Sequence, residues 1–343
     1  MCIQPCCHGK YIYGNTLYKI KAKSGATGKR QWTGPLGGTF PSAPASADLD
    51  MYAKRWYYSR DSNQIRYVSS GSGIGETVAF SVTMPNTNYV IHEVRVFPTI
   101  GKILYCAWDD GVSSPSPSTT GGFMAICNYD GSSSVTLSSV TGPRGNVAES
   151  HHGTVNLATN KVIYIRRAAG TPKVTTLRQC DLDGSNDTQL LDISTVAPKT
   201  VTDQYRLGGL DYDNQYIWFS NRGYETDTTP GTLFGDFGGL WRCSWTGTGK
   251  TRVLTNTAVG RSATEFLFWG EARPNRRDGR VYYWLGTSPT APGVMGVRSI
   301  LPDGTDDRFE LKAVGVQGYS GTLNFQSNCI LGEGYRNKTD LYS

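Results

Sequence analysis

The chain has 343 residues, of which 41 are glycine and 18% are charged, and its formal net charge is +6. Many turn residues, 11% aromatic residues and few charges favour an all-β domain over a helical one. The thinly spread positive charge argues against nucleic-acid binding. The sequence also lacks an apolar run of about 18 residues that would span a membrane, and the first residues, MCIQPCCHGK, lack the apolar core of a signal peptide.

Aromatic strands recur along the chain. They read KYIYGN (10–15), RWYYSR (55–60), KILYCA (102–107), KVIYIR (161–166), YIWFSN (216–221) and RVYYWL (280–285). Each is followed by a second apolar strand, and several of these strands end in an Asp-Gly turn. In such a turn the Asp side chain accepts a hydrogen bond from a backbone N–H, and Gly takes a positive φ. Multi-strand repeats of about 45 to 65 residues predict a β-propeller.

A short strand precedes each copy after the first and carries one polar residue between apolar neighbours. These polar residues are Asp50, Arg95, Asn156, Asp211 and, more loosely, Glu271, and a further one, Asn324, lies near the C-terminus. The first copy lacks such a strand, because CIQPCC is short and its proline cannot donate to a ladder.

These patterns predict a single propeller domain over residues 1–343 with six blades, which start near residues 1, 47, 92, 152, 207 and 266. A strand within 320–328 is expected to complete the N-terminal blade, which ties the two chain ends together and removes a sheet edge. Seven blades stay open as an alternative, because CILGEGYRNKTDLYS (329–343) could form two more strands.

The phrase LDYD…YIWFSN, followed by a strand and an Asp-Gly turn, resembles the YWTD repeat of the low-density-lipoprotein-receptor type of six-bladed propeller. The motif is degenerate: its positions read Trp218-Phe219-Ser220-Asn221 in the best copy and Tyr58-Ser59-Arg60-Asp61 in another. The resemblance covers the repeat pattern along most of the chain, and that family closes its ring in the way inferred above. TolB-type propellers share the Asp-Gly turn, so the resemblance implies a fold rather than a function.

The eight cysteines fall into two groups. Cys127, Cys180 and Cys243 each precede a turn glycine by four residues, and Cys106 takes the place of Ile165 in another copy. Equivalent positions in different blades are too far apart to bond, because bridged Cα atoms lie within about 7 Å. We therefore expect these four to be small buried apolar residues.

The second group lies at the chain ends. Three interpretations of this group stay open. The cysteines could form a disulfide to the C-terminal region or to a neighbouring subunit, or they could be unpaired thiols. They could also form a metal site with His8, although CxxxCC-H is not a standard zinc spacing. The residues of this group are Cys2, Cys6, Cys7 and Cys329.

The polar residues of the inner strands are predicted to line the central channel. Carboxylate and amide oxygens that converge on one axis could hold Ca²⁺. The alternative, which the positive charge of Arg95 favours, is a wet channel in which Arg95 pairs with an acid. The predicted ring is Asp50, Arg95, Asn156, Asp211, Glu271 and Asn324.

Long insertions at 109–122, 222–238 and 286–293 are predicted to open on one face of the disc. Aromatic side chains on such loops suit a protein or glycan partner, and packing on the neighbouring blade is the alternative. The binding candidates are His151, His152, Trp108, Tyr224, Phe234 and Phe237. No serine or cysteine elbow, HExxH or paired-acid motif accompanies the histidines, so no catalytic residue is predicted.

The leading hypothesis is a non-enzymatic structural or recognition propeller. It would contact protein partners or copies of itself in an extracellular, cell-surface or virion assembly such as a filament, shell or tail. Two alternatives stay open. One is a metal-dependent hydrolase or lyase with a channel metal and His151 or His152 as acid–base group, and the other is a lectin-like propeller that binds glycans.

Overall fold

The structure is a computed structural model of the chain. It describes residues 8–13, 16–21, 31–39, 46–50, 52–53, 55–59, 63–69, 76–85, 87, 89–109, 121–141, 153–168, 174–193, 201–202, 205–221, 224–225, 239–255, 272–275, 278–285, 295–313, 333–334 and 341–342. Within this part the one helix is a 3₁₀ turn at Pro98–Ile100, and no helix is long and apolar enough to cross a membrane.

The strands form six sheets of four or five strands and one smaller ladder. The first sheet holds β1 (His8–Tyr13), β2 (Thr16–Lys21) and β3 (Gln31–Thr39), with β26 (Glu333–Gly334) beside β1. The second sheet holds β4 (Ser46–Asp50), β5 (Arg55–Ser59), β6 (Gln64–Ser69) and β7 (Thr77–Ser81). The third sheet holds β8 (Tyr89–Phe97), β9 (Lys102–Asp109), β10 (Gly121–Asn128) and β11 (Val135–Thr141).

The second half of the chain repeats this order. The fourth sheet holds β12 (Gly153–Asn156), β13 (Lys161–Ala168), β14 (Val174–Asp181) and β15 (Thr188–Asp192). The fifth sheet holds β17 (Tyr205–Asp211), β18 (Tyr216–Asn221), β20 (Gly239–Ser244) and β21 (Thr251–Thr255). The sixth sheet holds β22 (Arg273–Asn275), β23 (Arg280–Leu285), β24 (Met295–Ile300) and β25 (Arg308–Ala313), with β27 (Leu341–Tyr342) on its outer edge. The small ladder pairs β16 (Val201–Thr202) with β19 (Tyr224–Glu225).

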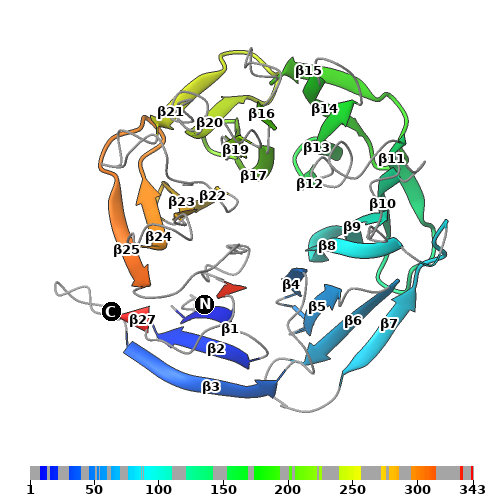
Figure 1. Cartoon of the computed structure of the whole chain (residues 1–343), viewed down its shortest axis with the longest axis horizontal. Coiled ribbons are helices and arrows are strands. Elements are labelled where there is room, and N and C mark those ends of the chain that lie inside the picture. The colour runs from blue at the N-terminus through cyan, green and yellow to red at the C-terminus, as the bar shows by residue number, and fades with distance from the viewer. Residues whose placement is uncertain are drawn as a thin grey trace, which may run out of the picture.

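Figure 1 shows the six larger sheets following one another around a central axis, with one strand of each innermost. Neighbouring strands are antiparallel, except where β26 runs parallel to β1 with Glu333 opposite Ile12. Radially placed sheets of this kind are the β-propeller architecture, so the prediction of an all-β propeller is confirmed. The closing strand predicted within 320–328 lies outside the described residues.

The aromatic strands owe their continuous apolar sequence to burial on both faces. In β18, Ile217 and Phe219 pack in a cluster with Ile163 of the fourth sheet, while Trp218 between them packs against the sixth sheet with Val281 and Tyr283. All three β18 side chains are fully buried. Because successive strand residues point to opposite faces, a strand between two neighbours reads as uninterrupted apolar residues rather than as an alternation.

The Asp-Gly turns adopt the predicted conformation. The glycines Gly131, Gly184 and Gly304 have φ of +81°, +81° and +92°. In the first of these turns the Asp130 Oδ1 accepts from the Ser132 backbone N–H at 2.9 Å and from its hydroxyl at 2.6 Å. Asp183 and Asp303 repeat both bonds in their own turns.

Each turn also packs on the outer strand of the preceding sheet. A Cβ built on Gly131 would lie 2.7 Å from the Phe80 ring of β7, and one on Gly247 would lie 2.2 Å from the Leu190 oxygen of β15. The glycine therefore serves two purposes: it permits the positive φ, and it lets one sheet approach the next.

The turn of the fifth sheet departs from the others because Thr246 stands where they carry aspartate. Its hydroxyl lies in a cluster with those of Ser244 and Thr248, and the Thr248 N–H donates to Ser244 Oγ at 3.1 Å. We expect Thr246→Asp to restore the carboxylate acceptor and to raise the Tm by about 1 to 3 °C. Calorimetry tests this, and the reverse change, Asp183→Thr, is expected to lower the Tm. An unchanged or lower Tm for Thr246→Asp would contradict the expectation.

Candidate functional site

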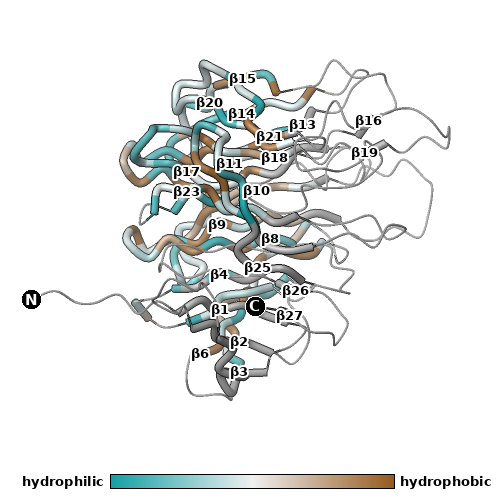
Figure 2. Tube along the Cα trace, turned by 90° about the vertical axis from the view of Figure 1, so that its left-hand side faces the viewer, coloured by the Kyte–Doolittle hydropathy of each residue, from teal (hydrophilic) through white to brown (hydrophobic). Residues whose placement is uncertain are grey.

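The sheets divide the ring into two faces. In the second to sixth sheets the first and third strands end at one face, which carries the described inner hairpin turns and the Asp-Gly turns and which we call the turn face. The opposite face carries the connections after the second and fourth strands, and we call it the loop face. Figure 2 shows β16 and β19 at its right-hand edge, on the loop face.

Three residues predicted to line the channel cap the inner hairpin turns. Asp50 Oδ1 accepts from the N–H groups of Tyr52 and Ala53, each at 2.9 Å, and Asn156 Oδ1 accepts from that of Ala158 at 3.0 Å. All three capping residues (Asp50, Asn156 and Asp211) are buried. Their side chains therefore satisfy backbone donors at the tips of the inner hairpins of the second, fourth and fifth sheets, in the manner of an Asx turn.

Asp211 shows the most complete cap. Its Oδ1 accepts from the N–H groups of Asp213 at 3.1 Å and Asn214 at 2.9 Å, and its Oδ2 accepts from the Asn214 side chain at 2.8 Å. Both carboxylate oxygens are thus engaged in the turn. The Ca²⁺ site stays a prediction, and within the described residues no group of three or more His, Cys, Asp or Glu side chains could hold a metal ion.

The strand register shows which residues are equivalent in the inner strands. Asp50, Asn156 and Asp211 are each the inner-strand residue that pairs with the first residue of the next strand, and in the third sheet Phe97 takes that place, opposite Lys102. Arg95 lies two residues earlier. In the sixth sheet the equivalent residue is Asn275, opposite Arg280, rather than Glu271, which lies outside the described residues together with Asn324.

Arg95 forms a buried ion pair with Glu93 inside β8. Its Nε donates to Glu93 Oε1 at 2.6 Å, and both side chains are buried. Asp48 of β4, also buried, accepts from the Val96 N–H of β8 at 2.9 Å, which joins the two inner strands. The β8–β9 ladder has a bulge between Ile91 and Glu93, and no sequence signal marks it.

Two further contacts join inner strands of successive sheets. The Leu157 N–H donates to Tyr212 Oη at 3.1 Å, which links the fourth and fifth sheets. The Gly209 N–H donates to the Ala272 carbonyl at 2.6 Å, which links the fifth and sixth. A Cβ on Gly208 would lie 2.2 Å from that carbonyl, so the Gly208-Gly209 pair permits the close approach.

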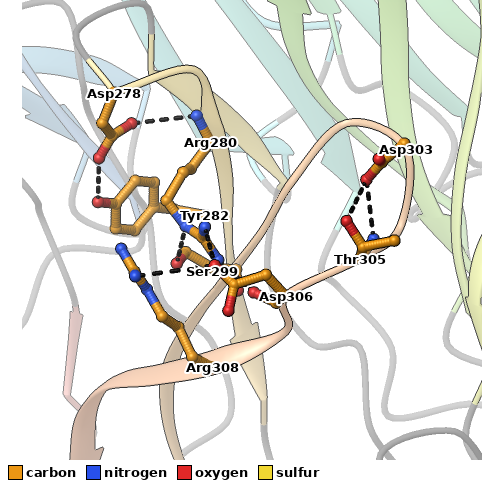
Figure 3. A network of polar contacts seen from close by, with 8 residues as sticks. All are labelled: Asp278, Arg280, Tyr282, Ser299, Asp303, Thr305, Asp306 and Arg308. Atoms are coloured by element: carbon orange, nitrogen blue, oxygen red, sulfur yellow. Dashed lines mark hydrogen bonds and ion pairs between the residues drawn. The ribbon is translucent and has the colours of Figure 1, made fainter.

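A polar network locks the strands of the sixth sheet together (Figure 3). The buried guanidinium of Arg280 donates to Ser299 Oγ at 2.7 Å and to Asp306 Oδ2 at 2.6 Å. Asp278 accepts from the Arg280 N–H at 3.1 Å and from the Tyr282 hydroxyl at 2.5 Å. Asp303, drawn in the same view, is engaged with Thr305 in the turn.

A Tyr–Arg–Asp contact recurs in the fourth and sixth sheets. The Tyr164 hydroxyl donates to Asp187 at 2.7 Å, and Arg178 binds the same carboxylate with Nε at 3.0 Å and Nη2 at 3.0 Å. Burial raises the pKa of Tyr164 above its ordinary value, and the hydrogen bond to Asp187 raises it further. The phenol therefore stays protonated and acts as a donor. The equivalent residues of the sixth sheet are Tyr283, Arg298 and Asp307.

The four described cysteines are free thiols and fully buried, as the repeat predicts. Burial raises the pKa of Cys127, Cys180 and Cys243 to about 12 and that of Cys106 well above its ordinary range. Cys2, Cys6, Cys7 and Cys329 lie outside the described residues, so their bonding stays a prediction.

We expect the four buried thiols to resist iodoacetamide at about pH 8 in the folded protein, because the thiolate is the reactive form. Peptide mass spectrometry with and without guanidinium chloride measures this residue by residue. Labelling of Cys127 at equal rates in both conditions would show that the expectation is wrong.

Most of the predicted binding residues lie outside the described residues: His151, His152, Phe234 and Phe237. Trp108 lies in β9, where it pairs with Val90 and Gly122. Tyr224 lies in β19, opposite Thr202 of β16. The backbone of Tyr224 is therefore held in a ladder on the loop face.

Comparison with solved structures supports the fold. The chain superimposes on a chain from a crystal structure of a nidogen/laminin complex with a TM-score of 0.54 and 9% identity, covering 88% of this chain and 91% of that one. For a putative TolB from Agrobacterium tumefaciens the TM-score is 0.51 at 14% identity, with 86% and 90% covered.

No protein-family model matches the sequence, and no curated protein matches it. At these identities the structural likeness concerns the fold alone.

Proposed function

We propose that this chain is a six-bladed propeller of the YWTD type that acts as a non-enzymatic recognition or structural module. In this proposal the six larger sheets are the blades, and β26 closes the ring by supplying the innermost strand of the N-terminal blade. The module contacts protein partners or further copies of itself in an extracellular or particle assembly.

One observation carries the proposal: the polar side chains described for the inner strands form hydrogen bonds that hold the propeller backbone together. Asp50, Asn156 and Asp211 cap inner turns, and Asp48 joins two inner strands. Inner strands held in this way form a rigid scaffold. In such folds, binding residues are often carried on the loops that the scaffold positions. The likeness to a chain from a nidogen/laminin complex, which is an assembly of two proteins, agrees with protein recognition.

Light scattering of the purified chain, with and without reducing agent, tests the proposal. We expect a mass that is a multiple of the 37.5 kDa monomer and that rises with concentration. A mass that falls on reduction would assign the contact to Cys2, Cys6 or Cys7. A monomer under both conditions, together with metal-dependent turnover of an ester or a polysaccharide, would contradict the proposal in favour of the enzyme alternative.

A further inference from the structure

The outer hairpin of the fifth sheet has an unusual charge. Residues 237–264 contain no aspartate or glutamate and four basic residues, Arg242, Lys250, Arg252 and Arg261. In the fourth and sixth sheets the third residue after the turn glycine is an acid, Asp187 or Asp307, which binds an arginine of the same sheet. Lys250 takes that place here, so this hairpin presents a cation where its counterparts hold a carboxylate.

Two cations of the hairpin gather over one aromatic ring. Lys250 Nζ lies 5.2 Å from the centre of the Trp241 ring, and Arg252 Cζ lies 5.5 Å from it. Trp241 and Arg252 form a cross-strand pair of β20 and β21. Lys250 is exposed, and the other two side chains are half-buried. Cation–π contacts of this kind orient the long side chains and preserve their charge. We call Trp241, Lys250 and Arg252 the basic hairpin.

The hairpin also forms the outer edge of the fifth sheet, next to the Gly304 turn of the sixth sheet. In the described part of the chain β21 pairs with β20 alone, whereas the outer strand of the next sheet, β25, carries the added strand β27, with Lys312 opposite Tyr342. The outer edge of a sheet in this fold thus accepts a further extended strand. Lysine on an edge strand discourages pairing with other cationic edges, and the same charge favours a strand that carries carboxylates.

We propose that the basic hairpin binds an acidic extended segment of a partner protein, which adds to β21 as a strand. Backbone hydrogen bonds to the edge would supply affinity, and carboxylates on alternate residues would meet Lys250 and Arg252. The inference rests on the proposed recognition function and names the chemistry of the partner.

Fluorescence anisotropy with labelled peptides tests this inference on the full chain. The probe alternates glutamate and valine, and two matched peptides replace glutamate by lysine or place proline at every third position. We expect the acidic peptide to bind and the other two not to bind. Raising the ionic strength from about 0.01 M to about 0.1 M shortens the screening length from about 30 Å to about 10 Å, so the affinity is expected to fall.

A pair of double variants assigns the site. Lys250→Gln with Arg252→Gln is expected to weaken binding about fivefold to tenfold, while Lys102→Gln with Arg308→Gln, which removes the same charge elsewhere, leaves it unchanged. Circular dichroism and the Tm check that both variants fold. Equal losses in both variants, or binding of the proline peptide as tight as that of the acidic one, would overturn the inference.

Two results separate this inference from the proposed function. Absence of acidic-peptide binding, in a chain whose light-scattering mass still shows assembly, would overturn the strand-addition site alone. Binding of a sulfated polysaccharide without binding of the peptide would also overturn it and would assign the basic hairpin to a glycan.

Discussion

Gly247→Ala is expected to lower the free energy of unfolding by about 3 kcal/mol. Alanine at the φ of +81° that this glycine adopts costs about 1–2 kcal/mol. The added Cβ would also lie 2.2 Å from the Leu190 carbonyl oxygen of the preceding sheet, and relief of such an overlap by backbone movement costs about 1–3 kcal/mol. Urea denaturation followed by circular dichroism measures the sum.

Gly249→Ala is the matched control in the same turn. Gly249 has a φ of +66°, and a Cβ built on it meets no atom within 4 Å. Its replacement is therefore expected to cost only the conformational part, about 1–2 kcal/mol. The difference between the two variants measures the contact between the fourth and fifth sheets. Equal losses would mean that this contact is absent in solution.

Glu93→Gln is expected to destabilise the fold by about 3–5 kcal/mol, because it leaves the Arg95 guanidinium without the carboxylate that lies 2.6 Å away in a buried site. The Arg308–Asp306 pair is the exposed comparison, since its atoms lie 3.8 Å apart and both side chains are about half exposed. Arg308→Gln is expected to cost less than about 1 kcal/mol.

A double variant distinguishes the contribution of the ion pair from the cost of leaving one charge buried without its partner. Glu93→Leu with Arg95→Met removes both charges at similar volume, and it is expected to recover most of the stability that Glu93→Gln loses. Thermal and urea unfolding measure the stability of the three proteins. A Glu93→Gln protein as stable as the parent chain would show that the ion pair contributes nothing to the stability of the fold.

Local chemistry accounts for what the sequence predicts well. The Asp-Gly turns depend on residues within four positions of each other, so the positive φ of Gly131, Gly184 and Gly304 follows from the amino-acid sequence alone. The continuous apolar strands such as β18, and the buried thiols Cys127, Cys180 and Cys243, follow from the repeat, because equivalent positions face equivalent neighbours. These features establish an all-β propeller and the order of its sheets.

Contacts between distant segments decided the rest. In the third inner strand Phe97, which pairs with the first residue of β9, matches Asp50. A search for one polar residue between apolar neighbours cannot find this position, because it holds phenylalanine. The polar residues of the inner strands look like a ligand ring in sequence, yet Asp50, Asn156 and Asp211 face their own turns.

The pairing of β26 with β1 joins residues 333–334 to residues 12–13. The sequence allows strands in both segments, but it does not specify that they pair. Sequence by itself determined the repeating unit, because its turns and apolar strands depend on neighbouring residues. The tertiary structure decided the register and partners of each copy, because those depend on which surfaces meet across the ring.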